Sequence, residues 1–266
     1  MIAQGLFAAL FPSDCRLCGA PLANISRLPG CLECISAMQP ISVGTCEICG
    51  EGMAGLVRSA EMRTCGACLE TRPWFEKACA YGSYDDELRE LIHLLKYEQV
   101  TPAADVLGGM LAGAIAKLEI PRPVVMIPVP LHSSKRRQRR FNQAELIARA
   151  ALKRPVMPGV ELATNLLMRQ RATVSQVGLT RPQRAENIRG AFRVEHPEQI
   201  SGRSILLIDD VLTTGTTASE CARVLRKSGA EKVWVATVAR TLKNTGMNAV
   251  AEPDFEIARS HHRNKK

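Results

Sequence analysis

The stretch Ile205-Leu-Leu-Ile-Asp-Asp-Val-Leu-Thr-Thr-Gly-Thr-Thr217 sets the architecture that we expect for this chain. It opens with four apolar residues in a row, a pattern typical of a strand that is buried on both faces in a parallel sheet. Two carboxylates, Asp209 and Asp210, follow at the carboxyl end of this strand, and a helical pattern begins around Ala218. A buried strand that passes through a short loop into a helix predicts an α/β fold.

The loop between the carboxylates and the helix has the composition of a phosphate site: Thr213, Thr214, Gly215, Thr216 and Thr217. A helix N-terminus offers backbone N–H groups and the positive end of the helix dipole, and both favour a phosphate. The glycine lets the backbone approach closely, and the threonine hydroxyls add donors. The two carboxylates suit the hydroxyls of a sugar or a divalent metal. Together these features predict a site for a phosphorylated, metal-chelating sugar.

The same stretch resembles the signature of type I phosphoribosyltransferases, which bind phosphoribosyl diphosphate (PRPP). The family pattern is an apolar strand, two acids, two variable positions and Thr-Thr-Gly-x-Thr. The resemblance implies a type I phosphoribosyltransferase fold, which is a Rossmann-like parallel sheet flanked by helices. It implies that Asp209 and Asp210 bind the ribose 2′ and 3′ hydroxyls, that residues 213–217 bind the 5′-phosphate, and that Mg²⁺ accompanies PRPP. The plain alternative is a strand, a turn and a helix cap that carries surface acids.

Composition supports one large α/β domain with a small additional module, because the chain has 266 residues of which 46% are hydrophobic. The formal charge of +9 suits a polyanionic ligand such as PRPP or a nucleic acid. Residues 1–11 are apolar but lack a basic region before them and are too short to span a bilayer. We expect no transmembrane segment and a cytoplasmic protein.

Residues 12–70 contain four Cys-x-x-Cys pairs, which predict a double zinc ribbon. The pairs are Cys15/Cys18, Cys31/Cys34, Cys46/Cys49 and Cys65/Cys68. Each half reads Cys-x-x-Cys-Gly, a spacer, and Cys-x-x-Cys-aliphatic, so we expect two consecutive tetrahedral sites, with a cross-braced pairing as the alternative. Disulfides are the competing interpretation, which a cytosolic location disfavours. Four thiolates leave no position open for water, so the two zinc ions would be structural.

Residues 74–240 are expected to form the phosphoribosyltransferase-like domain, and residues 241–266 a polar, basic tail. The apolar patterns predict strands over 77–84, 124–130 and 232–240, and helices over 85–97 and 103–119.

A run of cations follows the predicted strand over 124–130. It consists of Lys135, Arg136, Arg137, Arg139 and Arg140. Placed at a strand end beside the carboxylate pair, these side chains could neutralise the diphosphate that leaves PRPP. The alternative is a solvated basic loop, since runs of like charge repel one another.

The surroundings of this run resemble the ComF family of competence-associated, phosphoribosyltransferase-like proteins. The resemblance rests on Pro128-Val-Pro-Leu-His132, on Phe141-Asn-Gln-Ala144 and on the N-terminal cysteine module. The chain departs from the family's Arg-Gly-Phe-Asn-Gln, because Arg140 stands where the glycine is expected.

The ComF pattern continues in residues 170–192. Its matching positions are Ser175-Gln176-Val-Gly-Leu179, Arg181, Arg184, Asn187 and Gly190-Ala-Phe192. The resemblance implies a loop that closes over the substrate, with Gln176, Arg181 and Arg184 as binding residues. The alternative is a surface helix with ordinary arginines.

The resemblance implies Mg²⁺-dependent phosphoribosyl transfer to an unknown acceptor, in competence, DNA uptake and natural transformation. In relatives that use 6-oxopurines an acid opens the phosphate loop. Thr213 stands there in this chain, which disfavours hypoxanthine and guanine. The alternative is a non-catalytic competence protein that senses PRPP or binds single-stranded DNA, with competence or DNA-processing proteins as partners. Sparse aromatic residues, 4% of the chain, weaken a DNA site built on base stacking.

Overall fold

A computed structural model describes residues 14–22, 29–42, 44–53, 63–173 and 180–242. The chain forms a type I phosphoribosyltransferase-like α/β fold, preceded by a double zinc ribbon with two four-cysteine sites. The central sheet contains β1 (Ala78–Ser83), β2 (Val124–Pro128), β3 (Val160–Leu162), β6 (Ser204–Leu212) and β7 (Lys232–Arg240). Its order is β1-β7-β6-β2-β3, and all its strands are parallel.

Strand β6 lies between β2 and β7, so the apolar run found in the sequence is buried as expected. Ile205, Leu206, Leu207 and Ile208 are each 0% exposed. Their side chains alternate between the two faces of the sheet, because Leu206 and Ile208 belong to one hydrophobic cluster and Ile205 and Leu207 to the other. Burial of such a side chain stabilises the fold by roughly 1.5–3 kcal/mol.

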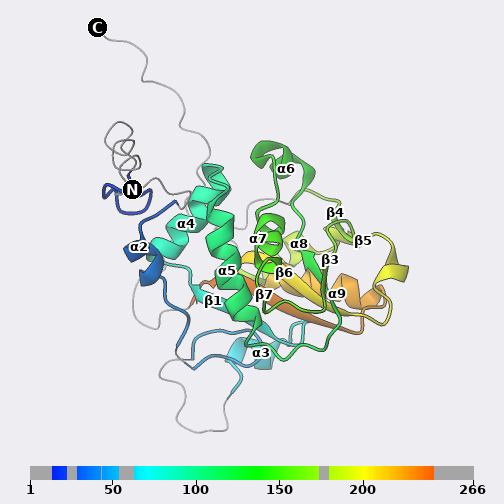
Figure 1. Ribbon diagram of the computed structural model, residues 1–266. Helices are drawn as coiled ribbons and strands as arrows, with labels where there is room; N and C mark the ends of the chain where they lie inside the picture. Colours follow the sequence, from blue (N-terminus) through cyan, green and yellow to red (C-terminus); the bar gives the residue numbers. More distant parts are fainter. Residues whose placement is uncertain (1–13, 23–28, 43, 54–62, 174–179, 243–266) are drawn as a thin grey trace.

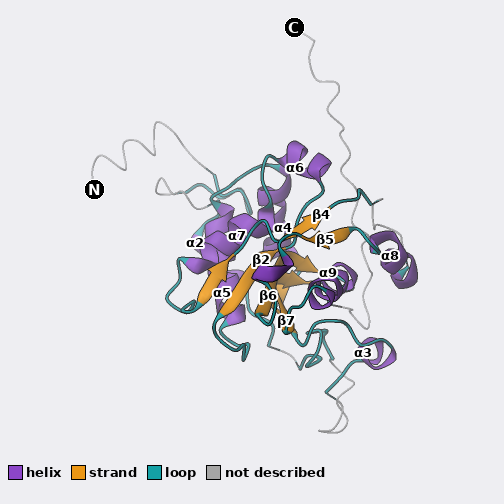
Figure 2. Ribbon diagram, turned by 90° about the vertical axis from the view of Figure 1, so that its right-hand side faces the viewer, coloured by secondary structure: helices purple, strands orange, loops and turns teal. Residues whose placement is uncertain are grey.

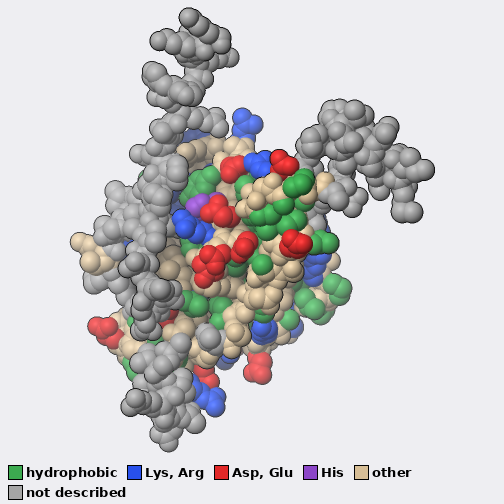
Figure 3. Space-filling model, turned by 90° about the vertical axis from the view of Figure 1, so that its left-hand side faces the viewer, with side chains coloured by type: hydrophobic (Ala, Val, Ile, Leu, Met, Phe, Trp, Pro, Cys, Tyr) green, Lys and Arg blue, Asp and Glu red, His purple; other side chains and the backbone are tan. Residues whose placement is uncertain are grey.

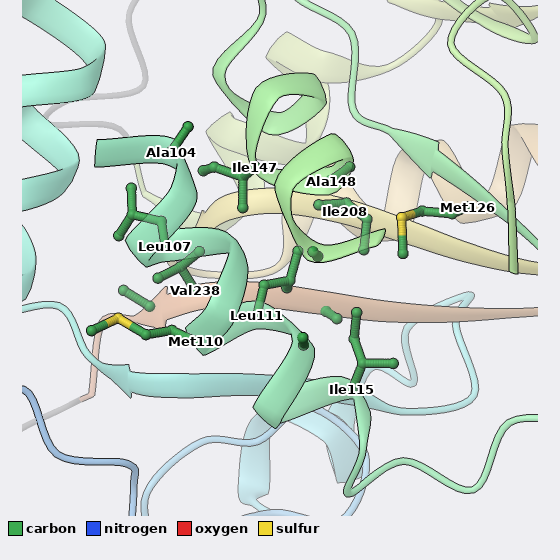
Figure 4. Close-up of a cluster of buried hydrophobic side chains, with 14 of the residues drawn as sticks. Ala104, Leu107, Met110, Leu111, Ile115, Met126, Ile147, Ala148, Ile208 and Val238 are labelled. Carbon is green, nitrogen blue, oxygen red and sulfur yellow. The ribbon is translucent and has the colours of Figure 1, made fainter. Parts of the chain in front are cut away.

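Helices α4 (Asp86–Tyr97), α5 (Ala103–Ile115) and α7 (Gln143–Leu152) pack with the first cluster, together with Met38, which follows α2 (Leu32–Ala37). Figure 1 shows α5 and α7 in front of the sheet. Figure 4 shows Leu107, Leu111 and Ile115 following one another along α5, in one cluster with Ile147 of α7 and residues of the strands.

The other face of the sheet is covered by α9 (Thr216–Lys227), α8 (Arg181–Ile188) and a two-stranded antiparallel sheet of β4 (Leu167–Arg169) and β5 (Phe192–Val194). Figure 2 shows the sheet between α7 on one side and α9 with α8 on the other. The apolar patterns did not predict β3, β4 or β5, because strands of three residues are too short to show a period.

The basic run forms α6 (Ser133–Arg139) rather than the expected loop. Arginine, lysine and glutamine have high helix propensity, and the His132 side chain caps the helix by accepting a hydrogen bond from Ser134 N. The helix ends at Arg140, whose φ of 67° is left-handed. The backbone therefore keeps the conformation that the family's glycine favours, although an arginine occupies the position.

Across the described ranges, no helix combines the length and the apolarity that crossing a bilayer requires.

Two glycines of α5 provide a matched test of how tightly α5 and α7 pack. A Cβ on Gly108 would lie 2.5 Å from Ala150 Cβ and 2.8 Å from the backbone of Ala150, whereas a Cβ on Gly113 would meet nothing within 4 Å. We expect Gly108→Ala to destabilise the protein by roughly 1–3 kcal/mol through overpacking. Gly113→Ala should stabilise it by roughly 0.5–1 kcal/mol through helix propensity. Urea unfolding measures both, and equal effects would contradict this packing.

Candidate functional site

The four cysteines of each half converge, so the consecutive pairing is confirmed and the cross-braced alternative is wrong. The first group is Cys15, Cys18, Cys31 and Cys34, and the second is Cys46, Cys49, Cys65 and Cys68. Within each group, all Sγ atoms lie within 4.8 Å of one another.

The separations of the sulfur atoms fit zinc and exclude disulfides in this structure. Cys15 Sγ lies 3.9 Å from Cys34 Sγ, and Cys49 Sγ lies 3.6 Å from Cys65 Sγ. A tetrahedron with Zn–S distances of about 2.3 Å has S···S edges of about 3.8 Å, whereas a disulfide bond is about 2.05 Å long. Each group therefore has the donor set and the spacing of a structural zinc site.

Backbone donors prepare these thiols to bind a cation. Burial alone would raise the pKa of Cys15, but N–H groups of Cys18, Cys31 and Leu17 donate to its sulfur and lower the pKa to about 6. In the second group Cys65 N donates to Cys46 Sγ at 3.3 Å. A thiolate is the form that binds zinc, so Cys15 and Cys46, whose pKa values are lowered, favour the ligating state, whereas burial raises the pKa of Cys34 and Cys68.

The carboxylate pair lies within the last residues of β6 and not beyond its end, because the strand continues to Leu212. Asp209 pairs in register with Thr237 of β7, and its Oδ1 accepts a hydrogen bond from Asp210 N at 2.9 Å. Asp210 Oδ1 accepts one from Val211 N at 2.8 Å. Both carboxylates are thus held close to the backbone.

Lys96 is a site residue that the sequence analysis missed. Its Nζ lies 3.0 Å from Asp210 Oδ2, with the two side chains 12% and 6% exposed. The signal in the sequence was a lysine four residues after Ile92, on the apolar stripe of α4 where a buried side chain is expected.

This ion pair separates the charge states of the two acids. Burial and the neighbouring charge of Asp210 raise the pKa of Asp209 to about 8. Burial would also raise the pKa of Asp210, but Lys96 and, more weakly, Arg139 outweigh it and hold the pKa below its ordinary value. At neutral pH Asp210 is therefore charged, while Asp209 largely retains its proton.

The threonine-rich loop turns directly after β6 and ends in α9. Gly215 has a φ of 75° and precedes the first residue of α9, and Thr214 Oγ1 lies 2.8 Å from Thr216 Oγ1. Residues 213–217 are all partly exposed, and the N–H groups at the start of α9 point toward them. The structure thus assembles the five loop residues at the helix N-terminus, as a phosphate site requires.

The predicted cations are only partly brought to the carboxylates. The Arg139 guanidinium turns inward, lies 5.1 Å from the centre of the Tyr97 ring and acts on the charge of Asp210. Lys135, Arg136 and Arg137 are exposed on α6.

The predicted lid, residues 170–192, is described in the structure except for residues 174–179. Gln176 lies outside the described residues, and so does the side chain of Arg181. Arg184 is half-buried on α8, which begins with a capping box formed by Thr180 and Gln183. Helix α8 is held beside α9 by the hydrogen bond from Gly190 N to Glu220 Oε1.

A second cation that the sequence did not reveal is Arg169, at the end of β4. Its guanidinium lies 5.5 Å from the centre of the Phe192 ring, and its charge acts on Asp209 and Cys221. Burial lowers its pKa. Because the two-stranded sheet of β4 and β5 was not predicted, no pattern in the sequence could have placed this arginine near the site.

Comparisons with known proteins agree with both modules. The family described as phosphoribosyl transferase domain matches residues 156–258, and the family described as double zinc ribbon domain matches residues 6–69. DNA utilization protein YhgH of Salmonella typhi is 32% identical over 235 residues, which cover 87% of this chain and 98% of the relative. Competence protein F of Haemophilus influenzae is 28% identical over 79% of this chain and 96% of its own. Competence protein ComFC of Bacillus subtilis is 22% identical over 75% of this chain and 78% of its own.

The raised pKa of Asp209 predicts a stability that falls with rising pH. A carboxyl group in an unfolded chain titrates near pH ~3.9, whereas Asp209 in the folded protein titrates at about 8. Between these values the unfolded chain releases a proton that the folded protein keeps, so its stabilising contribution is lost as the pH rises. Asp209→Asn, which cannot titrate, should therefore gain melting temperature over the wild type between about pH 5 and pH 8. A melting-temperature difference that stays constant across this pH range would contradict this.

The left-handed Arg140 predicts a stabilising substitution. A side chain in this conformation costs roughly 1–2 kcal/mol, which glycine avoids. After the entropy that glycine adds to the unfolded chain, Arg140→Gly should stabilise the protein by about 0.5–1 kcal/mol in urea unfolding. Arg140→Ala should give no such gain. If both substitutions stabilise equally, relief of charge repulsion on α6 would be the cause instead of backbone strain.

Proposed function

This chain belongs to the ComF family of competence-associated, phosphoribosyltransferase-like proteins, and we propose that it binds PRPP together with Mg²⁺ and transfers its phosphoribosyl group. The observation that carries this proposal is the arrangement at the end of β6. Asp209, which is partly exposed, and Asp210, which is buried, are followed by a glycine-centred threonine loop that leads into a helix N-terminus. A sugar that carries a 5′-phosphate and vicinal hydroxyls fits both parts at once.

Each group of the chain has a role that follows from its charge. Asp210, held as a carboxylate by Lys96, accepts a hydrogen bond from one ribose hydroxyl. Asp209 either donates its proton to a ligand oxygen or loses it when a cation arrives. The five loop residues bind the 5′-phosphate. When bound, Mg²⁺ would neutralise the diphosphate as it leaves.

The cations around the carboxylates favour departure of the diphosphate. Arg139 faces the site, and we place Lys135, Arg136 and Arg137 of α6 on the outer part of the diphosphate. Arg169, together with Arg184, Arg181 and Gln176 of the predicted lid, would lie over the ribose and the acceptor. Arg139, which already faces the carboxylates, would stabilise the negative charge that develops on the leaving group.

The alternative is a protein that binds PRPP or single-stranded DNA without catalysis, in the cytoplasm of a competent cell. The formal charge of +9 and the names of the relatives, which refer to DNA utilization and competence, favour it. Acidic side chains gather in the centre of the face shown in Figure 3, so a nucleic acid would be expected on another face.

Binding of PRPP tests the proposal directly. Isothermal titration of the zinc-loaded protein with PRPP and Mg²⁺ should give binding, and Asp209→Asn/Asp210→Asn should weaken it by at least about 10-fold, because two hydrogen bonds to charged or acidic groups are lost. Asp85→Asn/Asp86→Asn is the matched control, since it changes another adjacent pair of aspartates, both of them exposed. Absence of binding by the wild-type protein would overturn the proposal.

Pyrophosphate release separates the enzyme from the alternative. PRPP-dependent release with any member of a panel of bases and amines, lost in the double variant, supports phosphoribosyl transfer. Binding of PRPP without release, together with salt-sensitive binding of an oligonucleotide, would support the non-catalytic alternative.

A further inference from the structure

Arg240, the last residue of β7, joins the sheet to the second group of cysteines. Its side chain is 3% exposed, and its Nη2 donates to Cys49 Sγ at 3.6 Å and lies 3.0 Å from Glu51 Oε2. Four thiolates around one Zn²⁺ carry a net negative charge, so a guanidinium beside them compensates charge in a region that excludes water. This arginine is therefore positioned to stabilise the zinc-bound form of the second site.

The backbone of Arg240 lies beside the residue that precedes the phosphate loop. Arg240 pairs in register with Leu212 of β6, and Thr241 N donates to Leu212 O at 3.1 Å. Leu212 is the residue directly before Thr213. Arg240 thus contacts the zinc ligand Cys49 through its side chain and lies beside Leu212 through its backbone.

A second connection runs through the segment that follows the cysteines. Phe75 is 2% exposed and packs in the same cluster as all four cysteines of the second group. Its Cζ lies 3.9 Å from the point where a Cβ on Gly215 would stand. Trp74 N donates to Ser219 Oγ at 3.1 Å, in the first turn of α9. The cysteines of the second group and the phosphate loop are therefore joined through the same hydrophobic cluster, with Phe75 lying against Gly215.

The first group of cysteines makes different contacts. Leu17 and Met38 from this half pack with the cluster on the other face of the sheet, and Tyr81 Oη donates to Met38 O at 3.0 Å. Arg16, next to Cys15, forms an exposed ion pair with Glu98 after α4. In the described part of the chain, the contacts of this half lead to β1 and α4 and not to the threonine loop.

We infer that zinc in the second site and the ligand of the phosphate loop are bound cooperatively, with Arg240 as the positioning residue that couples them. The inference rests on the proposed function, which makes PRPP this ligand. Coupling of this kind is reciprocal in affinity: zinc in the second site raises the affinity for PRPP, and PRPP raises the affinity of that site for zinc by the same factor. The first site is not coupled in this way, although its four ligands are of the same type.

The test measures zinc release and PRPP affinity on the full chain. Zinc transfer to a chromophoric chelator should show two phases in the wild type, one for each site, and saturating PRPP with Mg²⁺ should slow one of them. Arg240→Met should speed the same phase by about 10-fold, the effect of one hydrogen bond to a charged group, and raise the Kd for PRPP by a similar factor. Arg16→Met is the matched control at the first site and should change neither quantity.

Arg240→Lys keeps the buried cation and guards against loss of the fold in Arg240→Met. It should remain folded and show the same changes with smaller amplitude. Wild-type binding of PRPP, combined with unchanged zinc release or unchanged PRPP affinity in both Arg240 variants, would overturn the coupling alone. Failure of the wild type to bind PRPP would overturn the proposed function, and the PRPP-linked coupling with it.

Discussion

The parallel pairing of β6 between β2 and β7 is the constraint on which the rest of the structure depends. Hydrogen bonds on both edges and hydrophobic clusters on both faces leave this strand no freedom to slip. A shift of one residue would exchange Leu206 and Ile208 with Ile205 and Leu207 and turn the carboxylates to the wrong faces. The position of the acidic pair and of the loop behind it is therefore fixed by the core.

Two adjacent carboxylates at a buried strand end are electrostatically unfavourable, and the fold resolves this with unequal surroundings. Lys96 comes from α4 on one side and stabilises Asp210 as a carboxylate. Asp209 is left to keep its proton, because burial and the charge of its neighbour both disfavour ionisation. The result is a pair of acids with different protonation states at one site, which suits a ligand that brings both hydroxyl groups and a metal ion.

The two zinc ribbons have the same ligands but different places in the fold. The first is attached to β1 and α4, whereas the second belongs to the hydrophobic cluster on the other face of the sheet and is contacted by Arg240 of β7. A repeated sequence thus gives two sites whose surroundings differ, because each half packs on a different face of one asymmetric domain.

Patterns in consecutive residues were sufficient to predict the elements that depend on interactions between near neighbours in the sequence. The buried strand, the glycine-bearing loop and the helix that follows it were predicted from consecutive residues, and the zinc ligands from the spacing of the cysteine pairs. The run of cations was placed correctly after β2 but as a loop, since helix propensity on α6 outweighs the mutual repulsion of its charges. Arg140 shows the limit of such patterns, because the backbone kept a left-handed turn where the sequence has no glycine.

The residues that the patterns could not place are those whose partners lie far away along the chain. In the sequence, Lys96 was visible only as a charge on an apolar stripe. Arg169 lies at the end of β4, a strand too short to predict. Arg240 contacts a cysteine 191 positions earlier in the chain. Periodicity tells which face of an element is buried, but it does not tell which element covers that face. The packing of the helices, the small β4–β5 sheet and the zinc ribbons on the central sheet determines which charged side chains come into contact. That packing therefore sets the electrostatics of the site.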